Sequence, residues 1–67
     1  MYEVHGVLSE HIYGVYSQVD SALRCVEENE LIAFEIWEMD KDGNGRLMLR
    51  ENAYNPSSNY PYPKKGF

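Results

Sequence analysis

The sequence predicts a small α+β domain, in which one amphipathic helix packs on one face of a single antiparallel sheet in the order β-β-α-β-β. Short runs rich in β-branched and aromatic residues recur along the chain, as they do in strands. One stretch between them places apolar residues at helical spacing. A chain of 67 residues, 43% hydrophobic and 25% charged, has the size and composition of one folded domain.

The first two strands are predicted at residues 2–8 and 12–16, where Tyr, Val, Ile and Leu predominate. The short polar gap between these runs favours an antiparallel hairpin. A two-residue turn in this gap would set Gly6 opposite Tyr13. An aromatic ring that lies over an opposing glycine stabilises such a position.

A helix is predicted to begin at Ser17, whose hydroxyl is suited to cap the first turn, with Asp20 three residues later in a capping-box arrangement. Asn29 is a plausible end. The predicted apolar stripe of this helix consists of Val19, Ala22, Leu23 and Val26.

Residues 31–39 fit two structures. In a helix, Ile32, Ile36 and Met39 would share one stripe. In a strand, the side chains would alternate between two faces. The Ile, Phe and Trp content favours the strand, and so does the need of the preceding helix for a sheet to cover. We therefore predict a strand at residues 31–39, paired with a final strand at residues 46–50.

The domain is expected to span residues 1–54, and residues 55–67 form a Pro- and Tyr-rich C-terminal segment that we expect to be an irregular tail. The longest apolar run has four residues, so no membrane span is predicted. The N-terminal residues lack the pattern of a signal peptide. Cys25 has no second cysteine to pair with and is expected to be a half-buried structural thiol in a reducing compartment. Together these observations indicate a cytoplasmic protein.

The charge is unevenly distributed. Residues 1–39 carry eight acidic side chains against Arg24 alone, a net charge of −7, and residues 40–67 carry +2. Such an acidic body disfavours direct binding of nucleic acid. It favours a basic partner, such as a protein that itself binds nucleic acid. The predicted partner-binding residues, three of which crowd the end of the helix, are Glu27, Glu28, Glu30, Glu35, Trp37 and Glu38.

Residues 40–51 resemble the calcium loop of EF-hand proteins. The resemblance implies a metal site with side-chain ligands at the first, third, fifth and twelfth places and a backbone carbonyl at the seventh. Those residues are Asp40, Asp42, Asn44, Arg46 and Glu51. Asp, Asn and Gly are also the residues that a tight hairpin loop requires, and Pro56 ends any exit helix early. Any Ca²⁺ binding is therefore expected to be weak, and no other cofactor is predicted.

Residues 13–17, Tyr-Gly-Val-Tyr-Ser, lead directly into the acidic helix, and Phe-Glu-Ile-Trp-Glu-Met follows at residues 34–39. In this sequence pattern, residues 1–40 resemble small bacteriophage-encoded β-β-α-β proteins. The resemblance implies a phage accessory protein that acts in a bacterial host cell, a group that includes inhibitors of host defence enzymes.

The expected function is that of a small acidic binding protein without catalytic residues. Its size disfavours a multi-substrate enzyme, and His5 and His11 show no ligand spacing. The most concrete version is an inhibitor of a host defence nuclease or CRISPR complex, an anti-CRISPR that occludes or mimics nucleic acid. A calcium-binding module is the alternative, and a homodimer is a further assembly open to the chain.

Overall fold

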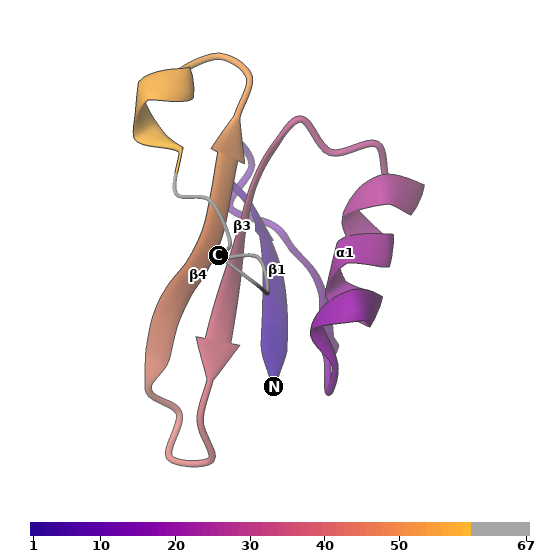
Figure 1. Cartoon of the computed structure of the whole chain (residues 1–67), viewed down its shortest axis with the longest axis vertical. Helices are drawn as coiled ribbons and strands as arrows, with labels where there is room; N and C mark the ends of the chain where they lie inside the picture. Colours follow the sequence, from indigo (N-terminus) through magenta and orange to yellow (C-terminus); the bar gives the residue numbers. More distant parts are fainter. Residues whose placement is uncertain (60–67) are drawn as a thin grey trace, which may run out of the picture.

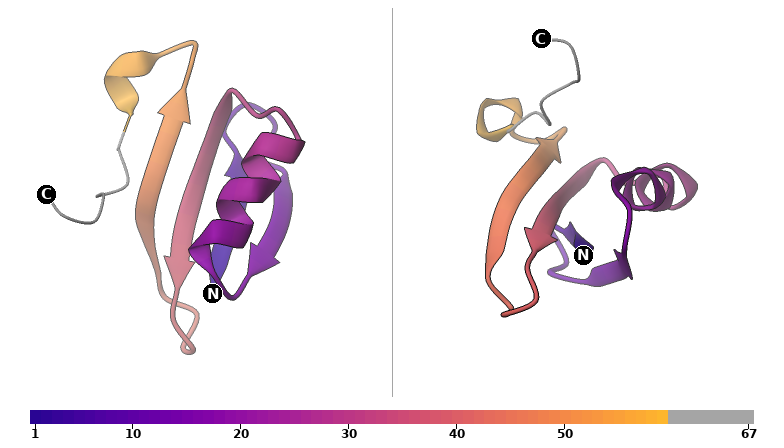
Figure 2. Two further views of the ribbon diagram at one scale, coloured as in Figure 1. Left: turned by 45° about the vertical axis from the view of Figure 1, so that its right-hand side comes forward. Right: turned by 60° about the horizontal axis from the view of Figure 1, so that its bottom comes forward.

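The computed structural model describes residues 1–59 of the chain. Its four strands form one antiparallel sheet in the order β2-β1-β3-β4, and one helix lies on one face (Figures 1 and 2). The predicted α+β fold is therefore confirmed. In chain order the elements are β1 (Tyr2–Gly6), β2 (Ile12–Tyr16), α1 (Val19–Glu28), β3 (Ala33–Met39), β4 (Gly45–Asn52) and the 3-10 turn η1 (Pro56–Ser58).

The helix is the crossover that this topology requires. Strands β2 and β3 are both antiparallel to β1, which lies between them, so they run parallel to each other. Parallel strands need a long connection between their ends. Helix α1 provides it and packs over β1 and β2 (Figure 2, left). No helix within residues 1–59 combines the length and the apolar character that a membrane crossing needs.

The core lies between this helix and the covered face of the sheet. Val4 of β1 and Ile36 of β3 are directly opposite each other and are completely buried. Ala22 and Cys25 of α1 pack on them. Cys25 is thus a structural thiol, but it is buried rather than half-buried. Leu23, which the helical spacing predicts to lie on the apolar stripe, is exposed.

The β1–β2 connection differs from the predicted two-residue turn. The amide of Gly6 donates to the carbonyl of His11 at 2.7 Å, which closes a four-residue loop whose last residue, Glu10, has φ 57°. A bulge at Tyr13 shifts the register further. The Tyr13 ring nevertheless lies beside Gly6, because a Cβ at Gly6 would be 3.0 Å from Tyr13 Cε2. The predicted register is wrong, and the aromatic cover of this glycine is confirmed.

The start of α1 differs from the prediction, and its end agrees with it. The residue before the helix is Gln18, and no side chain caps the first turn, so the Ser17 cap does not form. At the other end the amide of Asn29 donates to the Cys25 carbonyl at 3.0 Å, and the Asn29 side chain donates to the same carbonyl at 2.8 Å. Asn29 therefore ends the helix as predicted.

The segment at residues 31–39 is a strand from Ala33 onward, with Leu31 and Ile32 before it, and its predicted pairing with residues 46–50 is confirmed within the longer β3–β4 hairpin. Beyond β4, residues 55–59 are not an irregular tail. Pro56–Ser58 form η1, and the Asn52 amide donates to Asn59 Oδ1 at 2.8 Å. The rest of the predicted tail, residues 60–67, lies outside the described residues.

Matched isoleucine substitutions test the location of the core. Ile36→Val removes a methylene from a completely buried side chain and should lower the free energy of unfolding by roughly 0.5–1.5 kcal/mol. Ile32→Val makes the same chemical change at a side chain that is 56% exposed, and its effect should stay within about 0.5 kcal/mol. Urea denaturation of both variants measures the difference, and equal losses would contradict this core.

Candidate functional site

Three connections meet at one end of the sheet, the upper end in Figure 1. They are the β1–β2 loop, the α1–β3 loop and the chain that leaves β4. Two backbone hydrogen bonds hold them together: Val7 N donates to Ala33 O at 3.2 Å, and Ala53 N donates to Ile32 O at 2.9 Å. The C-terminal end of α1 lies at the same end (Figure 1). Segments that are far apart in the sequence therefore form one continuous surface.

Exposed glutamates gather on this surface. Residues 7–10, 27–32 and 51–54, which include the last residues of α1 and of β4, contain no lysine or arginine. Among residues 1–59 the ion pairs are Glu3–His5, Glu38–Arg46 and Glu35–Arg50, so none involves these glutamates. We call this surface the acidic end; its glutamates are Glu10, Glu27, Glu28, Glu30 and Glu51.

The charge arrangement at the acidic end is unfavourable within the folded chain itself. Glu27 and Glu28 lie in the last turn of α1, which contains no basic residue. Carboxylates at this position oppose the negative end of the helix dipole. Glu30 follows with φ 52°, a backbone conformation that few residues other than glycine adopt. Within residues 1–59 no ion pair to these glutamates offsets the costs.

Apolar side chains lie among the glutamates. Leu8 is 67% exposed and Ile32 is 56% exposed. An open hollow of about 260 Å³ lies beside Ile32, and its lining also includes Glu51 and Pro56. The acidic end therefore combines charge, exposed apolar area and a concave feature, which are the components of a recognition surface.

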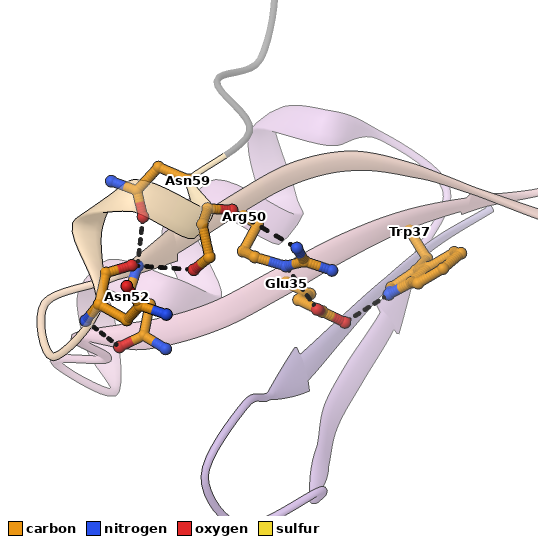
Figure 3. A network of polar contacts seen from close by, with 7 residues as sticks. Glu35, Trp37, Arg50, Asn52 and Asn59 are labelled. Atoms are coloured by element: carbon orange, nitrogen blue, oxygen red, sulfur yellow. Dashed lines mark hydrogen bonds and ion pairs between the residues drawn. The ribbon is translucent and has the colours of Figure 1, made fainter.

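The uncovered face of the sheet holds a second group of polar side chains (Figure 3). Glu35 alternates with the buried Ile36, so it points away from α1. Its carboxylate accepts a hydrogen bond from Trp37 Nε1 at 2.8 Å and one from Arg50 Nε at 2.8 Å. Arg50 also donates to the Ser58 carbonyl at 3.4 Å. The network joins β3, β4 and η1.

Two opposing influences act on the pKa of Glu35. Partial burial raises it, but the hydrogen bonds from Trp37 and Arg50, and the charge of Arg50, outweigh burial and hold the pKa below its ordinary value of 4.5. His5, whose ring stacks on Trp37 with centroids 6.4 Å apart, adds to the lowering. Glu35 is therefore a structural anion, and its two oxygens are already engaged.

The structure divides the predicted partner-binding residues among three places. The acidic end has Glu27, Glu28 and Glu30, and the uncovered face has Glu35 and Trp37. Glu38 lies opposite Tyr2 and pairs with Arg46 near the other end of the sheet. These six residues do not form one patch. The acidic end instead includes Glu10 and Glu51, which the sequence alone does not place there, because pairing between distant segments brings the ends of these connections to the same end of the sheet.

The five predicted metal ligands do not converge. The loop between β3 and β4 is a hairpin, and neither flank is a helix. Asp40 Oδ1 accepts hydrogen bonds from the amides of Asp42 and Asn44, both at 2.9 Å. Arg46 pairs with Glu38, and Glu51 lies six residues along β4 from Gly45, which is about 20 Å of extended chain. Among residues 1–59, no three His, Cys, Asp or Glu side chains lie close enough together to hold a metal ion.

Comparison of the chain with protein-family models, with curated proteins and with solved structures finds no match.

The lowered pKa of Glu35 predicts a pH dependence of stability. A carboxylate whose pKa is depressed in the folded state stabilises that state above its ordinary pKa, here 4.5, and loses the contribution as pH falls through the lowered value. Wild type should therefore exceed Glu35→Gln in stability near neutral pH, and the gap should shrink below pH 4.5. Denaturant titrations across this range measure it. Glu38→Gln is the control, because it removes a pair whose arginine side chain is 78% exposed and should have little effect throughout.

The role of Asp40 can be separated from metal binding. Asp40→Ala removes the acceptor for two loop amides and should cost about 1 kcal/mol of stability. Asp40→Asn keeps the Oδ1 acceptor and should retain most of it. Thermal melts of wild type in about 1 mM Ca²⁺ and in chelator should nearly overlay, because a millimolar site contributes only a few tenths of a kcal/mol. A large calcium-dependent rise in Tm that Asp40→Asn abolishes would contradict this assignment.

Proposed function

We propose that this protein is a small non-enzymatic binding protein that docks through its acidic end onto a basic surface of a larger protein. The observation that carries the proposal is the presence of five exposed glutamates, from four segments, at the end of the sheet that also carries the exposed Leu8 and Ile32. These charges repel one another, and Glu27 and Glu28 also oppose the dipole of α1. A basic partner turns the same arrangement into a favourable interaction.

The hollow at the acidic end suits the side chain of a lysine or arginine. The aliphatic part of such a side chain packs on apolar surface while its charged group stays accessible to an acid. Ile32 and Pro56 provide the apolar lining here, and Glu51 provides the carboxylate. Leu8 and Ile32 add apolar area, which charge alone does not supply.

Within this proposal the partner is a nucleic-acid-binding protein. Basic surfaces of that class are built to accept rows of phosphate charges, and closely spaced carboxylates present a similar potential. The resemblance to small phage proteins suggests the specific version: an inhibitor that occludes or mimics nucleic acid on a host defence nuclease or a CRISPR complex. The calcium-binding alternative gains no support from the geometry of the β3–β4 loop.

A matched pair of charge reversals tests the proposal. The wild-type protein, immobilised, is used to capture partners from a bacterial lysate, and the captured protein is then purified for affinity measurements. Glu27→Lys/Glu28→Lys should weaken its binding at least tenfold, as expected when charges at an interface are reversed (about 1.4 kcal/mol or more). The control Asp20→Lys/Asp42→Lys changes the net charge by the same amount at exposed positions away from the acidic end, and should bind nearly as wild type does.

Salt and competitor DNA complete the experiment. Raising the salt concentration from about 50 to about 500 mM shortens the Debye length from about 14 to about 4 Å and should slow association steeply. Double-stranded DNA should compete for the same partner surface. Equal losses in the two double variants would mean that net charge alone drives the association, and an unchanged affinity of Glu27→Lys/Glu28→Lys would remove the end of α1 from the interface.

A further inference from the structure

The β3–β4 hairpin contains two dipeptides of one chemical kind, Asp42-Gly43 and Asn44-Gly45. In each of them the backbone nitrogen of the glycine can attack the side-chain carbonyl carbon of the residue before it, because the ring that forms has five members. Glycine favours this attack, since it has no side chain to shield its nitrogen. A nitrogen whose N–H already donates a hydrogen bond is less available, and the structure distinguishes the two glycines on this point.

The nitrogen of Gly43 is engaged in the turn. Asp40 and Asn44 face each other across the loop, where the Asp40 amide donates to the Asn44 carbonyl at 2.9 Å. Gly43 closes the loop with φ 86°, and its amide donates to the Asp40 carbonyl at 3.1 Å. A turn followed by a glycine of positive φ is a common form of the three-residue hairpin loop. Asp42 is therefore followed by an amide that already has an acceptor.

The nitrogen of Gly45 points away from the neighbouring strand. Gly45 lies opposite Met39 in the pairing of β4 with β3. The amide and the carbonyl of Met39 are bonded to Met1, at 2.7 and 3.1 Å, so both face the side of β1. Opposite residues of an antiparallel pair turn their polar groups either toward each other or both away. The Gly45 amide thus points outward, where β4 is the outermost strand of the sheet.

The side chain of Asn44 is equally accessible. Asn44 is exposed, and the hydrogen bonds that it makes within residues 1–59 use its backbone. The other asparagines whose following residue the structure describes lack such a nitrogen. The amide after Asn29 donates to the Glu27 carbonyl at 3.1 Å, and the amide after Asn52 donates to the Ile32 carbonyl at 2.9 Å. A proline, which has no N–H, follows residue 55.

We propose that Asn44 is a site of spontaneous modification, at which the Gly45 nitrogen attacks Asn44 Cγ and forms a cyclic imide. The new bond joins this nitrogen to Cγ, the bond from Cγ to Nδ2 breaks, and Nδ2 leaves as ammonia with the proton that the Gly45 nitrogen gives up. Water then opens the ring at one of its two carbonyl carbons. One opening gives aspartate, and the other gives isoaspartate. The net reaction converts an amide and water into a carboxylate and ammonium, with no oxidation or reduction.

Both products alter the hairpin. Each places a new carboxylate at position 44, beside the Asp40 carboxylate that accepts the amide of this residue. Isoaspartate also adds a carbon to the main chain before Gly45, and it turns the carbonyl that accepts the Asp40 amide into a side group. The modified protein should therefore have a lower Tm. The inference goes beyond the proposed function and is independent of it, because the hairpin and the acidic end lie at opposite ends of the sheet (Figure 1).

The experiment follows the wild-type protein during incubation at neutral pH in water that carries heavy oxygen. Digestion by trypsin in ordinary water then releases residues 42–46 as one peptide, and mass spectrometry reads the label, which marks only changes that occurred before digestion. Asn44 should react at least about tenfold faster than Asn29 or Asn52, which corresponds to a barrier lower by about 1.4 kcal/mol. An unmodified Asn44, or equal rates at the three asparagines, would overturn the proposal.

A matched variant locates the reaction. Asn44→Gln keeps an exposed amide at this position but requires a six-membered ring, so the label in the peptide should fall at least about tenfold. A label that persists in this variant would place the reaction at Asp42 and overturn the assignment to Asn44.

Unfolding in urea tests the contribution of the fold. Because the Gly45 nitrogen is already accessible in the folded chain, urea should speed the reaction of Asn44 by less than about tenfold. Ring formation at Asp42 should speed up by a larger factor, since unfolding breaks the bond from the Gly43 amide to the Asp40 carbonyl. Equal acceleration at the two sites, or an Asn44 that reacts only in urea, would contradict the inference.

Discussion

The contact between Val4 and Ile36 under helix α1 is the constraint on which the rest of the structure depends. These two side chains are completely buried and lie directly opposite each other in neighbouring strands. The helix that covers them has ten residues and packs mainly on β1 and β2. A domain of this size has a single small core. Because one short helix covers one face, the other face of the sheet and one of its edges remain available for contacts.

The uncovered face is stabilised by polar contacts where it lies farthest from α1. Glu35 accepts hydrogen bonds from Trp37 and Arg50, and Arg50 reaches the Ser58 carbonyl in η1. These bonds connect two strands and the segment after them, so each member restricts the others. Closer to β2 the same face carries exposed apolar side chains. The uncovered face thus changes from hydrogen-bonded polar side chains on β3 and β4 to exposed apolar side chains on β2.

The acidic end illustrates how a stability cost points to function. Glutamates at the C-terminal end of a helix make the folded state less stable, because they oppose the helix dipole and repel one another. Here Glu27, Glu28 and Glu30 are joined by Glu10 and Glu51, and residues 7–10, 27–32 and 51–54 contain no lysine or arginine. A basic partner would convert this cost into binding free energy. The proposed function therefore rests on long-range charge at one end of the sheet.

The sequence by itself determined the fold class, the order of the elements and the end of the helix. These features depend on local patterns: strand-forming runs, one stripe at helical spacing, and Asn29, whose side chain caps the helix. The strand within residues 31–39 was also predictable, because its Ile, Phe and Trp content outweighs a partial helical pattern. Only the tertiary structure decided the register of the first hairpin, where the four-residue loop and the Tyr13 bulge depend on how the strand packs.

Tertiary structure also decided the composition of the candidate site. The spacing of residues 40–51 matches a calcium loop, but the flanking segments form β3 and β4 instead of helices, and an extended β4 carries Glu51 away from Asp40. Ligand spacing along a chain has meaning only with the backbone that converges it. In the same way, Glu10, Glu51 and the end of α1 lie at one end of the sheet, where backbone hydrogen bonds join the β1–β2 loop, the α1–β3 loop and the chain that leaves β4. No local pattern records that proximity, since it arises from pairing between segments that are distant in sequence.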